Sequence, residues 1–409
     1  MNKYFQKYGF QDIKLTQKPT DNLGLIVVIP CFNEKYITKT LNSLKDCKLS
    51  NCAVKIIVVI NQYEVVSEEI KLQNEVTFKE IESWKNQNEF EFSLDVLFEK
   101  NLPKKHAGVG LARKIGMDEA VMQFHLLEKD GIIICLDADC EVENNYFVEI
   151  EKHFEKYPKT PGCSIKYAHP ISGNDYSNEI YEGIINYELH LRYYNQALRF
   201  MRVPYGFHTV GSSMAIRSSA YQKQGGMNKR KAGEDFYFLH KIIELGSFTE
   251  LNSTTVIPSP RISDRVPFGT GKAIGDWIEK GELEYLTYDF CSFDSLKIVF
   301  DILLTIYNPS KYTIKNELVN SFLEQIDFEN KIEEIKNNTT NFESFKKRFF
   351  SYFNAFLILK FVHFARDTKY ENRPIEEQTK ILFKKVHNLD CDTFNKIELL
   401  NLLRKIEND

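Results

Sequence analysis

The chain has 409 residues, of which 43% are hydrophobic, so it can bury a sizeable core and is too long for one average domain. Its 53 basic and 57 acidic side chains give a formal net charge of -4. A chain with this balance has no global positive field for a nucleic acid backbone, so any anion site must be local. We therefore expect no nucleic-acid partner.

The sequence predicts neither a targeting segment nor a membrane span. Residues 1–15 contain no apolar core of signal-peptide length, and no run of about 18 uncharged apolar residues occurs. The eight cysteines include no Cys-x-x-Cys pair, which favours reduced thiols, several of them buried, over a disulfide framework or a zinc site. We expect a cytoplasmic protein, with contact to the inner face of a membrane as an alternative.

Short apolar runs alternate with helical patterns in the first half of the chain. Residues 25–29 form a β-rich run that ends at Pro30, and a helical pattern follows over 37–44. Similar runs occur at 54–60, 93–98 and 131–136. Because these runs are continuous rather than alternating, both faces of each strand should be covered. The pattern predicts an α/β fold with a doubly wound, mostly parallel sheet.

The later part of the chain is mainly helical. A 3-4-3-4-3 spacing of apolar residues over 184–201 predicts one face of a long amphipathic helix, and Gly, Pro and Ser at 257–271 predict a long irregular loop. The aromatic run at 349–365 predicts a buried helix or, as the alternative, a membrane-surface or lipid-acceptor contact. We expect an N-terminal extension over 1–22, an α/β domain over 23–275 and a helical C-terminal region over 276–409.

Two carboxylates, Asp137 and Asp139, directly follow the strand predicted at 132–136. Ligands of doubly wound sheets bind beyond the carboxyl ends of the strands. In extended geometry residues i and i+2 point to the same side, which would suit a hard cation such as Mg²⁺ or Mn²⁺. The alternative is a polar loop in which Asp caps a helix or forms a turn.

Glu234 and Asp235 form a second acidic pair, before the helix predicted at 236–245. An Asp at a helix start is by default a cap for free backbone N–H groups. Its functional alternative is a general base that takes the proton of an attacking hydroxyl group.

Basic residues in glycine-bearing segments are candidates for phosphate binding. Arg113 follows Gly108 and Gly110 at the start of a predicted helix, where it could bind phosphate or ribose or simply lie on the surface. Arg261 and Arg265 lie in the predicted loop, which would suit a lid over a diphosphate, with a solvated surface loop as the alternative.

Seven short segments occur together in an order that resembles the family 2 glycosyltransferases of GT-A fold. The resemblance runs over roughly residues 23 to 250, and each segment is unspecific when taken alone. The segments are VVIPCFNE at 27–34, IVV at 57–59, GVGLARKIG at 108–116, LDAD at 136–139, GSSMAIR at 211–217, GGM at 225–227 and GED at 233–235.

The resemblance implies a GT-A-like domain of the nucleotide-diphospho-sugar transferase superfamily. Its donor would be a nucleoside diphosphate sugar, and its acceptor a glycan, a lipid-linked compound or a small molecule. Residues implied in contacts with the base and ribose are Pro30, Phe32, Asn33, Glu34 and Asn61, with Arg113 as a further candidate.

The resemblance also implies which residues carry the metal and the chemistry. Asp137 would face ribose or metal, and Asp139 would ligate the Mn²⁺ or Mg²⁺ that bridges the diphosphate. Asp235 would be the catalytic base of an inverting displacement, with Glu234 beside it.

The sequence departs from the family pattern at several positions. Asn61 is followed by Gln62 and Tyr63 where the family commonly has an Asp-Asp-Gly-Ser type run, which leaves uridine recognition open. Lys114 replaces a usual Asn. No Gln-x-x-Arg-Trp motif follows Asp235, which favours a non-processive transferase.

Two other functions remain as alternatives. A sugar nucleotidyltransferase is also α/β and metal-dependent, but it needs a glycine-rich basic loop after the first strand, where this chain has residues 30–34. A catalytically degenerate transferase domain could instead act as a scaffold or binding module through its helical tail.

Overall fold

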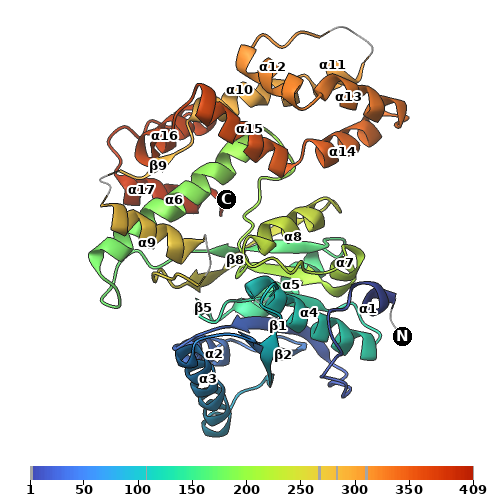
Figure 1. Ribbon diagram of the computed structural model, residues 1–409, viewed down its shortest axis with the longest axis vertical. Coiled ribbons are helices and arrows are strands. Elements are labelled where there is room, and N and C mark those ends of the chain that lie inside the picture. The colour runs from blue at the N-terminus through green and yellow to red at the C-terminus, as the bar shows by residue number, and fades with distance from the viewer. Residues whose placement is uncertain (1–2, 107, 266–268, 282–283, 309–311, 409) are drawn as a thin grey trace. The chain divides into compact units, whose positions relative to one another are not determined.

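The computed structural model describes residues 3–106, 108–265, 269–281, 284–308 and 312–408. The chain divides into two compact units (Figure 1). The first contains the residues up to Tyr181 together with Thr209–Gly275, and the second contains Glu182–His208 and Asp276–Glu407.

Within the described residues, the first unit is built on one eight-stranded sheet. Four of its neighbouring strand pairs are parallel and three are antiparallel, because β7 lies antiparallel between β4 and β6, and β5 lies antiparallel at one edge. The order is β3-β2-β1-β4-β7-β6-β8-β5. The strands are β1 (Leu23–Cys31), β2 (Ala53–Tyr63), β3 (Ser93–Leu102), β4 (Ile132–Cys135), β5 (Cys140–Val142), β6 (Gly162–Tyr167), β7 (Met214–Arg217) and β8 (Thr249–Pro258).

Helices cover both faces of this sheet. Figure 1 shows α2 and α3 on one side of β1 and β2, and α4 on the other. Two helices, α6 (Asn178–Phe200) and α9 (Thr270–Lys280), continue from one unit into the other along the chain. The remaining helices of the first unit are α1 (Lys3–Tyr8), α2 (Ile37–Lys45), α3 (Glu68–Gln87), α4 (Val109–Leu126), α5 (Tyr146–Lys156), α7 (Ser218–Lys223) and α8 (Glu234–Ile243).

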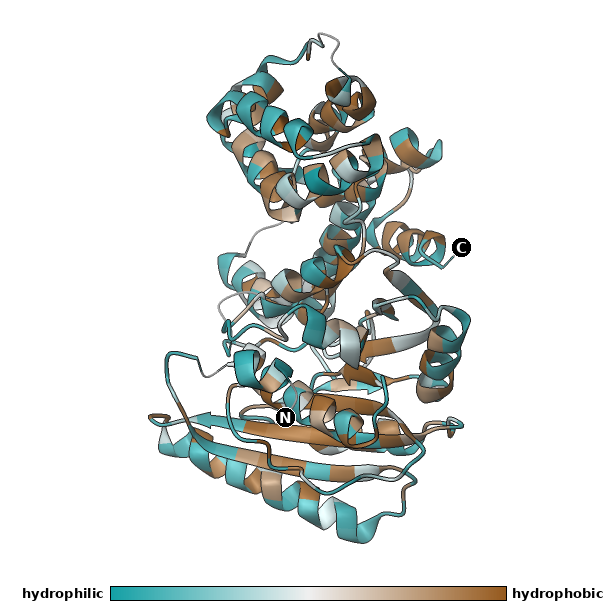
Figure 2. Cartoon of the chain, turned by 90° about the vertical axis from the view of Figure 1, so that its right-hand side faces the viewer, coloured by the Kyte–Doolittle hydropathy of each residue, from teal (hydrophilic) through white to brown (hydrophobic). Residues whose placement is uncertain are grey.

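The central strands form where the sequence has its continuous apolar runs. All residues of β4 and all but one of β1 are buried, which requires covering layers on both sides of the sheet. In Figure 2 the strands are mostly coloured as hydrophobic, whereas the helices show both colours. The predicted α/β fold with a mostly parallel sheet and a C-terminal helical region is confirmed.

The direction of chain progression through the sheet reverses beside β1. The chain moves outward from β1 to β2 and β3, then returns through α4 to β4, which pairs with the free side of β1. The carboxyl ends of β1 and β4 therefore adjoin at a topological switch point, where open α/β sheets bind their ligands. The residues that follow these two strands are 32–36 and 136–139.

Residues 3–22 pack along α4. Tyr4 is buried and its hydroxyl donates to Asp118, and the amides of Lys14 and Leu15 donate to the two carboxylate oxygens of Glu119. These contacts fix α1 beside α4, within the first unit.

Among its described residues, the second unit is helical apart from the short pair β9 (Leu286–Thr287) and β10 (Arg373–Pro374). The expectation of one helix over 349–365 is wrong, because α14 ends at Tyr352 and Asn354 caps a new helix by accepting from the amides of Phe356 and Leu357. Buried phenylalanines of both helices lie in the core of this unit. The helices are α10 (Phe290–Asp301), α11 (Leu303–Tyr307), α12 (Glu317–Gln325), α13 (Phe328–Asn337), α14 (Phe342–Tyr352), α15 (Ala355–Thr368), α16 (Ile375–Leu382) and α17 (Lys396–Ile406), with a π-helical turn at Phe383–His387.

In the part of the chain that the structure describes, no helix combines the length and the apolar character needed to cross a bilayer.

A buried ionic network joins α6 to the last helix of the second unit. Glu188 accepts from Arg192 Nε at 2.8 Å and from Arg404 Nε at 2.7 Å, and Arg192 also pairs with Glu407. Burial alone would raise the pKa of Glu407, but His208 and Arg192 outweigh it and lower this pKa to about 2. Glu407 therefore stays ionised in the folded unit.

Replacing Glu407 by Gln should destabilise the protein by about 2 to 3 kcal/mol at neutral pH, because it removes a charge that compensates the buried Arg192. Since folding lowers the pKa of Glu407 from its ordinary 4.5, its stabilisation is present above that value and is lost as the pH falls towards 2. Urea unfolding of both proteins at neutral and acidic pH measures the difference. The exposed Glu333→Gln is the matched control. A stability difference for Glu407→Gln that does not shrink in acid would contradict this account.

Candidate functional site at the switch point

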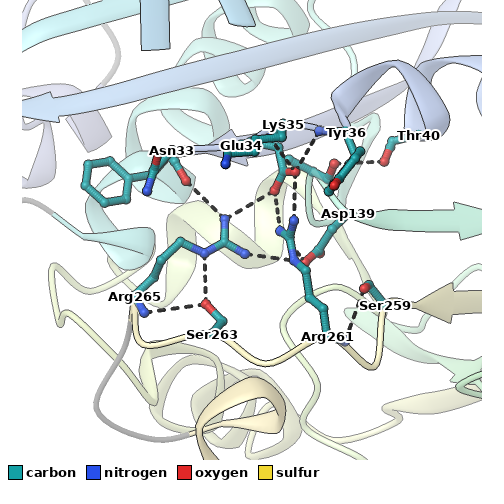
Figure 3. A network of polar contacts seen from close by, with 12 residues as sticks. Asn33, Glu34, Lys35, Tyr36, Thr40, Asp139, Ser259, Arg261, Ser263 and Arg265 are labelled. Carbon is teal, nitrogen blue, oxygen red and sulfur yellow. Dashed lines mark hydrogen bonds and ion pairs between the residues drawn. The ribbon is translucent and has the colours of Figure 1, made fainter. Parts of the chain in front are cut away.

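A cluster of two carboxylates and two arginines lies at the switch point. Arg261 donates through Nη1 to Glu34 Oε1 at 2.9 Å, and its Nη2 pairs with Glu34 Oε2 and with Asp139 Oδ2, the latter at 2.7 Å. Arg265 lies 3.2 Å from Glu34 and 3.4 Å from Asp139. Figure 3 shows both guanidinium groups pointing towards the two carboxylates. The cluster therefore links the loops that follow β1, β4 and β8.

The Glu34 carboxylate is fixed from several directions. It is fully buried, and Oε1 also accepts from the backbone amides of Lys35 and Tyr36, each at 2.9 Å. Burial raises the pKa of Glu34, but the hydrogen bonds and charges of Arg261 and Arg265 outweigh it, so the pKa is lowered. The ionised form of Glu34 is therefore favoured in this arrangement.

Asp139 responds differently to the same two arginines. Its pKa is raised, first by burial and then by the nearby Asp137 and Glu34, with Arg261 and Arg265 opposing. A further cation next to Asp139 would therefore be favourable, because this carboxylate is only partly compensated.

A second cluster surrounds Arg113, which lies in the second turn of α4 and is 3% exposed. Its two terminal nitrogens pair with Glu234 and with Asp137. Asp235 lies within the field of the same guanidinium and accepts from the backbone amides of Gly211 at 2.9 Å and Phe236 at 2.7 Å. Three carboxylates from two segments far apart in sequence thus share one buried cation.

Gly211 has no space for a side chain. A Cβ atom there would lie 2.5 to 2.7 Å from three atoms of the Arg113 guanidinium, which is closer than any non-bonded contact allows. The glycine lets the backbone reach both the guanidinium and the Asp235 carboxylate. The segment at 211 therefore belongs to the site through its backbone.

The two acidic residues that begin α8 have raised pKa values. Burial raises the pKa of Glu234 to about 7, against the opposing effect of Arg113 and with a further contribution from Asp235. The pKa of Asp235 is also raised, first by burial and then by Asp137, while Arg113 and the amides of Phe236 and Gly211 oppose the change. One proton on Glu234 near neutral pH relieves the repulsion among the three carboxylates.

The structure corrects the geometry expected at Asp137 and Asp139. The extended conformation is wrong, because residues 138 and 139 form a turn that the Cys140 amide closes on the Asp137 carbonyl at 3.1 Å. As a result Asp137 pairs with Arg113, whereas Asp139 pairs with Arg261 and Arg265. The 137–139 turn is the point where the two clusters meet.

Asp137 and Asp139 would be the residues to hold a hard divalent cation, under one condition. No group of three or more His, Cys, Asp or Glu side chains arranged for a metal occurs among the described residues. Asp137 and Asp139 nevertheless offer two carboxylates, and cations such as Mg²⁺ take their other ligands from phosphate oxygens and water. Asp139 can serve in this way only if Arg261 and Arg265 release it.

The residues predicted to contact a base or ribose lie around the ends of β1 and β2. Phe32 stacks on Tyr63 with ring centroids 6.1 Å apart, and Asn61 is buried near the end of β2. Pro30 is not in the loop but inside β1, paired in register with Val59.

Sequence reasoning missed the polar residues of α3 that hold the loop after β1. Asn74 Oδ1 accepts from the Asn33 amide at 2.9 Å, and Thr77 and Gln73 donate to the Glu34 carbonyl. Asn74 and Thr77 are fully buried. Two polar residues on the inward face of an otherwise amphipathic helix were the signal that could have indicated them.

No protein-family model matches the sequence, and no curated protein matches it. Solved structures similar to this chain include a Staphylococcus aureus TarS fragment, residues 1–349, in complex with UDP, at a TM-score of 0.40 and 14% identity, covering 68% of this chain and 66% of that chain. The same fragment in complex with UDP-GlcNAc is similar at a TM-score of 0.40 and 15% identity, covering 68% of this chain and 67% of that chain. A longer S. aureus TarS structure is similar at a TM-score of 0.35 and 15% identity, covering 68% of this chain and 43% of that chain. Likenesses at this level do not bear on what this chain binds.

Replacing Glu234 by Gln should make stability less dependent on pH. Folding raises the pKa of Glu234 from 4.5 to about 7, so its contribution to stability is complete below 4.5 and is lost as the pH rises through 7. Gln resembles the protonated side chain and cannot ionise, so the Tm of Glu234→Gln relative to wild type should rise between about pH 5 and pH 8. Differential scanning fluorimetry across this range measures it.

The exposed Glu155→Gln in α5 is the matched control, for which the Tm difference should stay flat. The assignment fails if the Tm difference for Glu234→Gln is also independent of pH.

Proposed function

We propose that this chain is a glycosyltransferase of the GT-A type that transfers a sugar from a nucleoside diphosphate donor to an acceptor hydroxyl group. One observation carries the proposal. Asp137, which follows β4, and Glu234, which begins α8, both pair with the buried Arg113, with Asp235 next to Glu234 and Asp139 in the same turn as Asp137, at the switch point of a doubly wound sheet. Two acidic pairs about a hundred residues apart in sequence thus form one site.

The donor side of the proposed site lies over β1 and β2. The stacked rings of Phe32 and Tyr63 and the buried Asn61 are suited to a nucleoside, by stacking and by hydrogen bonds to a base edge. Arg261 and Arg265 can each offer paired donors to diphosphate oxygens in place of the carboxylates that they now contact.

Asp137 and Asp139 would hold a Mg²⁺ or Mn²⁺ ion between the chain and the diphosphate. Such an ion supplies charge stabilisation on the departing phosphate. When Arg261 and Arg265 move from Asp139 to the phosphates, the carboxylate becomes available as a ligand and the arginines keep a negative partner. In this exchange of partners, both arginines stay paired with a negative group while the donor binds.

Asp235 is the proposed general base of an inverting, non-processive reaction. The amides of Gly211 and Phe236 orient its carboxylate, and the raised pKa makes it a stronger base than an exposed aspartate. As the acceptor oxygen attacks the anomeric carbon, the bond to the diphosphate oxygen breaks and the hydroxyl proton passes to Asp235. Glu234 holds Arg113 in place and does not need to touch the substrate.

The first test is a thermal-shift panel of UDP-, GDP-, CMP- and dTDP-sugars with and without Mn²⁺. We expect one nucleotide to raise the Tm in a metal-dependent way, because ligand binding stabilises the folded state. Asp139→Ala should lose this shift, whereas Asp235→Asn should keep donor binding and lose at least about a hundredfold in transfer rate.

Each result in this panel decides a specific point. Full donor binding by Asp139→Ala would move the metal elsewhere, and a high transfer rate in Asp235→Asn would remove the base assignment. No shift with any donor would favour the scaffold function over catalysis.

Replacing Arg261 by Ala should weaken binding of a nucleoside diphosphate by roughly tenfold while leaving binding of the free nucleoside unchanged, because the guanidinium is assigned to the phosphates. Calorimetric titration with both ligands measures the two affinities. Arg261→Lys should recover part of the loss, since it keeps the charge without the paired donors. The exposed Arg348→Ala is the control. Equal losses for nucleoside and diphosphate would argue against a phosphate contact.

A further inference from the structure

An exposed basic surface lies beside the Arg113 cluster, and nothing in the proposed reaction requires it. Three chain segments form it: α1, the loop before α4 and the loop before α8. We define the basic surface by its exposed members, which are Lys7, Lys104, Lys105, Lys229, Arg230 and Lys231.

Specific contacts bring the three segments together. The Lys229 ammonium lies 5.1 Å from the centre of the Phe10 ring, which joins the loop before α8 to the segment after α1. A Cβ atom at Gly108 would lie 3.0 Å from the Lys231 Cα, so the two loops also touch. Desolvation first, and then the charges of Lys229, Lys105 and Lys231, lower the pKa of His106 in the same place.

The loop before α8 is fixed at its base. Asn228 donates through Nδ2 to the Glu234 carbonyl at 2.9 Å and accepts from the Arg230 amide, and the Arg230 guanidinium stacks 3.6 Å over the Tyr237 ring. The cations are therefore held at one surface by the same residues that begin α8.

These charges lack compensation within the chain. None of the six members of the basic surface forms an ion pair with any carboxylate that the structure describes. The whole chain carries a formal net charge of -4, so this local excess runs against its overall balance. Clustered, unpaired cations repel one another, and an anionic partner would relieve that repulsion.

Aromatic residues of the same surface favour a lipid partner over a dissolved polyanion. Tyr8 is 39% exposed and lies against Gly225, and Phe5 and Phe10 are half-buried beside it. Rings with a polar tip next to lysines are typical of surfaces that lie at the boundary between headgroups and acyl chains. A polyanion without apolar groups, such as polyphosphate, would gain nothing from an exposed Tyr8, whereas a bilayer covers it.

We propose that the basic surface binds anionic phospholipid bilayers and orients the first unit on them. Lysines and arginines spread over three segments match a plane of negative headgroups, and their attraction falls off within a Debye length. Lys231 lies four residues before Asp235, so docking would keep the proposed acceptor side close to the lipid. The proposal does not depend on the transfer reaction.

The test is co-sedimentation of the full chain with vesicles of phosphatidylcholine alone and of equal parts phosphatidylcholine and phosphatidylglycerol. We expect binding to the anionic vesicles that weakens as NaCl is raised, and none to phosphatidylcholine alone. The triple variant Lys105→Glu, Lys229→Glu and Lys231→Glu should lose roughly tenfold or more in vesicle affinity. Tyr8→Ser should weaken vesicle binding and leave its salt dependence unchanged.

The control carries the same change of charge elsewhere on the first unit, at exposed and unpaired lysines: Lys48→Glu, Lys79→Glu and Lys159→Glu. Loss of vesicle binding in this control to the same extent would overturn the proposal, because net charge alone would then explain it. Tighter binding of wild type to soluble polyphosphate or RNA than to anionic vesicles would also overturn it. Donor thermal shifts, measured in parallel, show separately whether the proposed function stands.

Discussion

The buried ion pairs of Arg113 are the interaction on which the rest of the site depends. One guanidinium holds Asp137 from the end of β4 and Glu234 from the start of α8, and Gly211 contacts it through a backbone without a side chain. Removing this cation would leave the buried Glu234 carboxylate without compensation, which is far more costly than losing a surface pair. The ion pairs of Arg113 therefore hold α4, the end of β4 and the start of α8 together.

The cluster of Glu34, Asp139, Arg261 and Arg265 also pairs carboxylates with arginines, but in a way that a ligand can change. Arg261 is a partner of Glu34 and of Asp139, in a loop between β8 and α9, whereas Arg113 lies within a helix packed on the sheet. An incoming diphosphate must replace contacts that already exist, so only the difference between the two sets of pairs contributes to affinity. The helix-borne arginine suits a fixed support, and the loop-borne arginines suit an exchange.

Position in the fold was readable from the sequence, and long-range pairing was not. Continuous apolar runs predicted β1, β2 and β4, and the rule that ligands bind beyond the strand ends indicated the right loops. The burial of Arg113, the turn at Asp139 and the support of the Glu34 loop by Asn74 were missed or predicted wrongly. The burial of Arg113 and the support of the Glu34 loop involve partners distant in sequence, Glu234 for Arg113 and Asn33 for Asn74, which local patterns do not identify. The turn at Asp139 is closed locally by the Cys140 amide, and the expectation of an extended segment overlooked it.

Three carboxylates share one cation, and the acidic residues can therefore have different roles. Glu234 is paired directly with Arg113 and has a pKa near 7, so near neutral pH it can hold a proton that reduces repulsion within the cluster. Burial also raises the pKa of Asp235, but the backbone N–H groups of Gly211 and Phe236 oppose this change and favour its ionised form. Because the environments of these two neighbouring carboxyl groups differ, Glu234 can regulate the charge of the cluster and Asp235 can accept a proton. In the proposed reaction, Asp235 is therefore the member of the pair that can remain ionised and accept the hydroxyl proton.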